Sequence, residues 1–131
     1  ENRSVKKRYV ALLDGYLTEK EDSGCIDLPL CADLKDRPKQ MVNEEFGKCA
    51  ITLYKVLEQA NNITKIALYP QTGRTHQLRV HCAHPNGLGV PIKGDRLYGR
   101  GEGRLCLHAE AIEFVHPIHH KVMRFENKAP F

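Results

Sequence analysis

Residues 50–69 read AITLYKVLEQANNITKIALY, and this stretch decides the fold class. Both halves are rich in β-branched and aromatic residues, which favour strands. Between them lies Asn61-Asn62, a pair typical of a turn. We therefore predict a β-hairpin of strands 50–57 and 63–69, with a short connection and with Pro70 ending the second strand. A hairpin with this spacing has no room for a crossover helix, so the sheet is predicted to be mainly antiparallel.

Further short strands are predicted on both sides of the hairpin. They cover residues 5–17 with a bend at Asp14-Gly15, residues 25–30, and residues 122–125. Residues 105–115 fit either a strand or a helix. Residues 32–40 and 86–103 are expected to be loops, and the second, which holds six glycines, is expected to contain a short element around Ile92.

Residues 75–84 are the best helix candidate. Thr75 is expected to cap the start, Leu78 and Cys82 share one face, and Pro85 ends the helix. The predicted fold is therefore α+β, with a mainly antiparallel (mixed) β-sheet and one or two helices in a single domain over residues 1–131.

Composition indicates a globular chain with reduced cysteines. The hydrophobic fraction is 41%, and no apolar run approaches the ~18 residues that a membrane span requires. The five cysteines are odd in number and form no C-x-x-C pair, so reduced thiols and a cytoplasmic location are expected. The net charge of +4 is too small an excess to indicate nucleic acid by itself.

The most informative motif is P-Q-T-G-R-T-H-Q-L-R-V-H, residues 70–81. A glycine turn leads into the predicted helix start, where free backbone N–H groups favour an anion, and Arg74 and Arg79 lie close by. The residues alone fit a phosphate or carboxylate site, and they fit equally well a helix start with surface arginines. No metal site is predicted, because His76 and His81 are five residues apart and do not share a helix face.

This motif, followed by P-I-K-G-D-R-L-Y-G at residues 91–99, resembles the signature of the RluA family of pseudouridine synthases. Residues 7–15 resemble the family's K-x-Y-x-A-x-x-x-G strand, and residues 105–117 resemble its L-x-L-H-A-x-x-x-x-F-x-H-P segment. Residues 27–30 and 37–40 resemble the branch of small enzymes that act on ribosomal and transfer RNA. The resemblance covers nearly the whole chain in order, and it implies the C-terminal part of that family's catalytic fold.

The resemblance implies a function and two catalytic residues. The family isomerises uridine to pseudouridine in RNA without a metal or organic cofactor, through an aspartate that attacks a flipped uridine. Its arginine falls on Arg79 and pairs with that aspartate, and its tyrosine falls on Tyr9, which stacks on the base and is implicated in proton removal. RNA is the implied partner, with no membrane. The residues expected to contact it are Lys7, Arg37, Lys39, Arg74, Thr75, His76, Gln77 and Arg96.

One departure from the family pattern has consequences. The H-R-L-D-x-x-T-S-G motif, which supplies the nucleophile and precedes the Tyr9 strand in the family, does not occur in this sequence. We therefore expect the chain alone to be inactive, and expect self-association through an uncovered sheet edge or face. Two alternatives stay open: a non-catalytic RNA-binding module, and a globular domain that binds a small anion at residues 72–75.

Overall fold

The computed structural model describes residues 5–18 and 21–131 as one helix and eight strands. The helix is α1 (Gln77–Ala83). The strands of the large sheet are β1 (Lys6–Leu13), β2 (Ser23–Asp27), β5 (Ile51–Ala60), β6 (Ile63–Pro70), β7 (Leu107–Val115) and β8 (Val122–Glu126). The remaining two, β3 (Leu30–Ala32) and β4 (Gln40–Val42), form a separate small hairpin.

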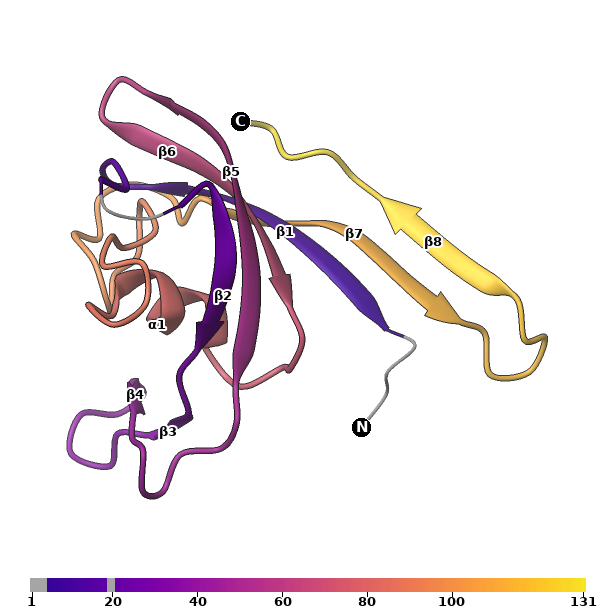
Figure 1. Cartoon of the computed structure of the whole chain (residues 1–131), viewed down its shortest axis with the longest axis horizontal. Coiled ribbons are helices and arrows are strands. Elements are labelled where there is room, and N and C mark those ends of the chain that lie inside the picture. The colour runs from indigo at the N-terminus through magenta and orange to yellow at the C-terminus, as the bar shows by residue number, and fades with distance from the viewer. Residues whose placement is uncertain (1–4, 19–20) are drawn as a thin grey trace.

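The large sheet has the order β2-β5-β6-β1-β7-β8, and each pair of neighbours is antiparallel (Figure 1). The α+β class, the antiparallel sheet and the single helix agree with the prediction from sequence. Residues 105–115, which fitted either a strand or a helix, contain strand β7.

The predicted β5–β6 hairpin is confirmed, and its connection is only two residues long because β5 continues to Ala60. Asn61 and Asn62 have φ angles of 54° and 61°, and two successive positive φ values are the geometry of a type I′ turn. Asparagine tolerates this conformation, and the turn matches the twist of the flanking strands. The strands consequently stay paired up to Ala60 and Ile63.

The short strand predicted over residues 25–30, ending near Pro29, is present as β2, but its bounds differ. β2 ends at Asp27, and Leu30 pairs with Val42 of β4 instead. Pro29 lies between them, and its missing N–H prevents a continuous ladder. The loop expected over residues 32–40 connects β3 to β4, and the short element expected around Ile92 is a bridge between Ile92 and Leu13.

The hydrophobic core lies on one face of the sheet, between β1, β5, β6 and helix α1 (Figure 1). Alternate residues of β1 and β6 point to this face, and they include the fully buried Ala11, Leu13, Ile66 and Leu68. Strands β7 and β8 project away from α1 (Figure 1), and they carry exposed apolar side chains. Those side chains are Val115, Val122 and Phe125, with Ile118 in the connecting turn.

Within the described part of the chain, no helix has the length and apolar character needed to cross a membrane.

Candidate functional site

A cavity of about 320 Å³ lies where β1, the end of β6, the turn after it and α1 meet. Six of the ten residues that the sequence proposed for the site line this cavity. They are Lys7, Tyr9, Arg74, His76, Gln77 and Arg79. The structure thus brings together residues from two motifs that are about 65 positions apart in the chain.

Strand β1 places Lys7 and Tyr9 on the cavity side of the sheet, because residues two apart in a strand share a face. Tyr9 is held between β6 and β7, opposite Leu68 on one side and Ala109 on the other. The pairing with β7 shifts register between Arg8 and Tyr9, which marks a bulge at this point. Bulges are frequent beside active sites, where they redirect a side chain.

The start of α1 differs from the prediction. Thr75 is exposed and is not the cap; His76 occupies the N-cap position with φ 57°, and its side chain makes no capping hydrogen bond. The backbone N–H of Arg74 donates to Oε1 of Gln77 at 3.1 Å, so the side chain of Gln77 satisfies a donor that the sequence left free for an anion. The tertiary contacts of Gln77 outweigh the local capping preference of Thr75.

Gln77 fastens this turn to strand β5. Its Nε2 donates to the Ile51 carbonyl at 3.0 Å and to Oγ1 of Thr52 at 3.0 Å. Its Oε1 also accepts from the Thr72 hydroxyl at 2.7 Å. The side chain of Gln77 therefore holds the turn at 72–77 together and also bonds it to strand β5.

His81 continues the network into the core, where it is fully buried. Its Nε2 lies 2.9 Å from the Leu28 carbonyl, which only accepts, so Nε2 carries the proton. Nδ1 then accepts from the Thr52 hydroxyl at 2.8 Å. Burial lowers the pKa of His81 despite the opposing effect of the Leu28 carbonyl, so the ring stays neutral in this network.

Arg79 forms a two-pronged ion pair with Asp95. Its Nε donates to Oδ2 at 3.0 Å and its Nη2 to Oδ1 at 2.7 Å. The Asp95 side chain is 0% exposed, whereas that of Arg79 is 19% exposed. Burial acts to raise the pKa of Asp95, but the Arg79 hydrogen bonds and two backbone N–H groups outweigh it, so this pKa lies below its usual value.

Asp95 and Tyr98, which bond to the cavity residues Arg79 and His76, were not selected from the sequence. Oδ1 of Asp95 accepts the N–H groups of Leu97 and Tyr98 at 3.0 and 3.1 Å, which forms a tight turn. That turn brings the Tyr98 ring against Arg79, whose guanidinium carbon lies 5.4 Å from the ring centre. Both residues lie in the G-D-R-L-Y stretch at residues 94–98, where an aspartate and a tyrosine follow a glycine. The glycines around this stretch indicated a loop, and only Arg96 was selected from it.

Glycine is required at position 94 for this arrangement. Its φ is +84°, and a Cβ there would lie 2.1 Å from the Arg104 carbonyl oxygen. The chain therefore passes close to the 104–105 backbone immediately before Asp95, and only glycine fits this approach.

The remaining proposed residues lie elsewhere. Arg37 and Lys39 belong to the connection between β3 and β4, and Lys39 pairs with Asp36 at 3.2 Å. Thr75 and Arg96 are exposed, and neither lines the cavity. These four residues are consequently separate from the cavity that holds Tyr9 and Arg79.

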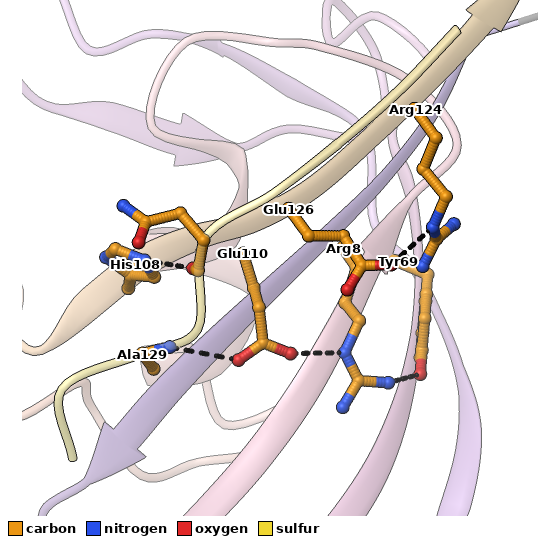
Figure 2. Close-up of polar contacts among 8 residues, drawn as sticks. Arg8, Tyr69, His108, Glu110, Arg124, Glu126 and Ala129 are labelled. Atoms are coloured by element: carbon orange, nitrogen blue, oxygen red, sulfur yellow. Dashed lines mark hydrogen bonds and ion pairs between the residues drawn. The ribbon is translucent and has the colours of Figure 1, made fainter.

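A second arginine cluster lies next to Tyr9 in sequence, built around Arg8 (Figure 2). Nε of Arg8 donates to Glu110 at 2.9 Å, and its Nη1 donates to the Tyr69 hydroxyl. The other oxygen of Glu110 accepts the N–H of Ala129 at 3.1 Å. This cluster ties the C-terminal residues to β7, and Arg8 does not line the cavity.

Cysteines and groups of metal-ligating side chains are the remaining candidates for chemistry. Cys82 is fully buried, and burial raises its pKa to about 12. Among residues 5–18 and 21–131, no group of three or more His, Cys, Asp or Glu side chains is placed to hold a metal ion.

Comparison with known proteins points to one family. A family described as RNA pseudouridylate synthase matches residues 1–84. The chain is 44% identical over 135 aligned residues to the dual-specificity RNA pseudouridine synthase RluA of Pasteurella multocida, and 45% identical to the protein of that name from Escherichia coli K12. Each alignment covers 98% of this chain and 59% of the relative, so the chain spans little more than half the length of these proteins.

Solved structures agree. Human RNA pseudouridylate synthase domain containing 1 superposes with a TM-score of 0.81 at 32% identity, over 98% of this chain and 56% of that one. Human RNA pseudouridylate synthase domain containing 4 superposes with a TM-score of 0.76 over 98% of this chain and 59% of that one; at 24% identity it supports the fold alone.

Proposed function

Because this chain belongs to the RNA pseudouridylate synthase family, we propose that it forms the C-terminal part of a catalytic domain that isomerises uridine to pseudouridine in RNA. One observation carries the proposal. Tyr9 and Arg79, which come from two separate motifs, line a single cavity together with the cationic side chains of Lys7 and Arg74.

The cavity suits a nucleotide that has been turned out of its RNA. Stacking of a base on Tyr9 contributes about 1–3 kcal/mol, and extruding the base costs a few kcal/mol. These two terms nearly cancel, so cationic contacts to the RNA backbone must drive binding. Two further hollows of about 460 and 400 Å³ share Lys7 with the first, and Tyr9 also lines the second of them, so a strand of RNA has room to continue beyond the cavity.

Asp95 is not the nucleophile in this proposal. It is fully buried, and both of its oxygens are held by Arg79. Nη1 of Arg79, by contrast, makes no hydrogen bond within the described residues, and the side chain lines the cavity. A carboxylate supplied by polypeptide beyond these 131 residues would meet Nη1, which would keep it ionised and oriented.

The reaction conserves atoms and electrons. The carboxylate attacks the bound uridine, and the bond between the ribose C1′ and N1 of uracil breaks. The base turns and rejoins C1′ through C5, and the bond to the carboxylate breaks, which frees that group. The proton on C5 is then lost, with Tyr9 taking part in its removal, and N1 takes up a proton in its place. No redox partner is required, and we propose that no metal or organic cofactor takes part.

The RNA is proposed to be ribosomal or transfer RNA. In support, residues 27–30 and 37–40 resemble the enzymes acting on those substrates. Arg37, Lys39 and Arg96 are exposed or half-buried outside the cavity, where they would contact RNA phosphates. Thr75, which is exposed outside the cavity, and His76, which lines it, would also contact the RNA.

The test is Arg79→Ala in the full-length protein, assayed by tritium release from RNA labelled at uridine C5. We expect turnover to fall by about 10²–10³-fold or more, since an oriented charge is lost from the site. RNA affinity should stay within about threefold, because Arg79 faces a carboxylate rather than the backbone. Arg8→Ala is the matched control and should retain turnover. Unchanged turnover in Arg79→Ala would remove Arg79 from the mechanism.

We also propose that the 131-residue chain alone does not turn over, because no H-R-L-D run occurs in its sequence. Tritium release by this purified chain would contradict the proposal. RNA binding by the full-length protein with no release at all would favour a non-catalytic binding module instead.

Self-association of the chain is proposed through the β7–β8 region. Val122 and Phe125 are 66% and 55% exposed on strand β8, at one end of the sheet. Contacts between such strands bury apolar surface and pair free backbone groups. Sedimentation velocity should show concentration-dependent dimers that Val122→Glu weakens, whereas Leu34→Glu, at another exposed apolar position, should not. A monomer at all concentrations would contradict this.

A cytoplasmic location is also proposed. Its support is that all five cysteines are free, which suits a reducing compartment.

A further inference from the structure

His76 has an unfavourable backbone conformation that contacts with other residues must stabilise. Its φ of 57° lies in the left-handed region, which non-glycine residues rarely adopt and which costs about 1–3 kcal/mol. Such residues persist where surrounding contacts hold them, and they cluster at functional sites. The contact that holds the ring of His76 comes from Tyr98, 22 residues further along the chain.

The hydroxyl of Tyr98 lies between two partners. The backbone N–H of Gln40 donates to it at 2.8 Å, and Nδ1 of His76 lies 2.8 Å from it. Among the described residues, the hydroxyl has no third partner. The single proton of Tyr98 is therefore best satisfied by donation to Nδ1 of His76. Burial raises the pKa of Tyr98 despite the opposing effect of the Gln40 N–H, so this proton is retained at neutral pH.

This hydrogen bond determines what His76 can offer a ligand. With Nδ1 accepting, the neutral ring carries its proton on Nε2, which has no partner within the described residues. The ring lines the cavity beside Tyr9 and Arg79. The charged groups around it are Arg79 on α1, Asp95 in the following loop, Lys7 on β1 and Arg74 in the turn. Burial and then Arg79 lower the pKa of His76, and Asp95 only partly opposes them.

We propose that Tyr98 is a positioning residue that fixes His76 as a neutral Nε2–H donor for an acceptor oxygen of the RNA bound in the cavity. The proposal deepens the proposed function and rests on it for the nature of the ligand. It also assigns a role to the turn that begins at Asp95. That turn orients Arg79 through the Asp95 carboxylate and His76 through the Tyr98 hydroxyl, so one loop sets two polar groups of the cavity.

The first experiment reads the His76 ring directly and does not depend on activity. Long-range ¹H–¹⁵N spectra of the ¹⁵N-histidine-labelled full-length protein, with His76 assigned through His76→Asn, should show the proton on Nε2. In Tyr98→Phe, the two ring nitrogens should average between tautomers, and the pKa of His76 should rise because a hydrogen bond to the neutral form is lost.

Two controls accompany it. Tyr69→Phe removes a hydroxyl that does not contact His76 and should leave the ring unchanged. The signals of His81, whose tautomer is fixed by Leu28 and Thr52, report that each variant is folded. A proton on Nδ1 of His76 in the wild type overturns the proposal without any variant. An unaltered tautomer and pKa in folded Tyr98→Phe overturns it as well.

The second experiment measures, during turnover by the full-length protein, whether the effect of Tyr98 depends on His76. Tyr98→Phe should lower kcat/KM about tenfold, the effect of one weakened hydrogen bond to the substrate. In the background His76→Asn, which tolerates the left-handed conformation, the same change should cost less than about twofold. Equal losses in both backgrounds would show that Tyr98 does not act through His76. A wild type that makes no pseudouridine would sink the proposed function, whereas the tautomer measurement would still decide the role of Tyr98.

Discussion

Two arginines, Arg8 and Arg79, each bind a carboxylate in this molecule, and only one of them lines the cavity. Arg79 directs two nitrogens to Asp95, which is 0% exposed. Arg8 divides its nitrogens between Glu110, which is 19% exposed, and the Tyr69 hydroxyl (Figure 2). The pair of Arg79 with Asp95 is buried beside the cavity. The pair of Arg8 with Glu110 lies nearer the surface, and Glu110 also accepts a hydrogen bond from Ala129 in the C-terminal residues.

The comparison shows that two similar ion pairs have different roles, one in orienting a cavity side chain and the other in anchoring the C-terminal residues. A buried pair is weak evidence for stability, because desolvation of its charges offsets their attraction. Arg79 and Asp95 are thus costly to bury, and their arrangement leaves one nitrogen of Arg79 for a further partner. The pair at Arg8 uses Glu110 to anchor Ala129, which explains it without any ligand.

The largest expected effect comes from removing the buried acid. Asp95→Ala leaves the guanidinium of Arg79 without its carboxylate and deletes the acceptor that holds the N–H groups of Leu97 and Tyr98. We expect urea unfolding to show a loss of about 3–5 kcal/mol in the free energy of unfolding. The same substitution at Glu110 should cost about 1 kcal/mol or less. Equal losses at the two positions would contradict the distinction between the pairs.

A charge-preserving change separates geometry from charge. Arg79→Lys keeps the cation but loses the planar fork that holds two oxygens at once. In the full-length protein, kcat/KM for tritium release should fall about 100-fold, or about 2.7 kcal/mol. Arg8→Lys should change it less than about threefold, since Arg8 does not line the cavity. Comparable activity of the two variants would show that the fork of Arg79 has no special role.

The pH dependence of stability should follow two histidines, the half-buried His76 at the cavity and the fully buried His81 in the core. The pKa values of His76 and His81 are both lowered by burial, so the unfolded chain takes up protons at a higher pH than the folded one. The free energy of unfolding should then fall as pH drops below the ordinary histidine value of about 6.5. The slope should be up to about 1.4 kcal/mol per unit for the buried His81, and smaller for the half-buried His76 because solvent screens it.

Urea unfolding between pH 7.5 and 5, compared with His81→Gln, measures this slope. The variant should be less stable at neutral pH, because its network with Thr52 is lost, but its stability should depend less on pH. His119→Gln, at an exposed position, is the control and should keep the wild-type slope. A wild-type stability that rises on acidification over this window would overturn the assignment of neutral, buried rings.

How much the sequence predicted depends on the range of the interactions involved. The β5–β6 hairpin followed from local composition and from Asn61-Asn62, since turn and strand preferences act between neighbours. Tyr9, Arg74 and Arg79 were selected because they lie within continuous motifs, and all three line the cavity. Thr75 was wrongly expected to cap α1, because Gln77 bonds to β5, 25 residues away, and no local preference reveals such a bond.

Asp95 and Tyr98 were missed for the same reason. Their partners are 16 and 22 residues away, and the surrounding glycines indicated a loop whose conformation the sequence does not specify. Gly94 instead permits a close backbone approach that seats Asp95 under Arg79. Glycine content alone does not distinguish a mobile loop from a tightly packed one, because both require residues without a side chain.

The smallest expected effect tests the claim that the Arg8 cluster is structural. Glu110→Gln keeps an acceptor for the Ala129 N–H but removes the charge opposite Arg8, and the pair is partly exposed. We expect a loss of about 0.5–1 kcal/mol in stability, faster amide exchange at residues 127–129, and tritium release unchanged within about twofold in the full-length protein. Turnover that fell as steeply as in Arg79→Lys would show that Glu110 takes part in the reaction. Such an effect could reach the cavity through strand β1, because Arg8, the partner of Glu110, directly precedes Tyr9. Protected amides with normal turnover would instead mean that the C-terminal residues are held by contacts other than this ion pair, such as the bond from His108 to the Asn127 carbonyl.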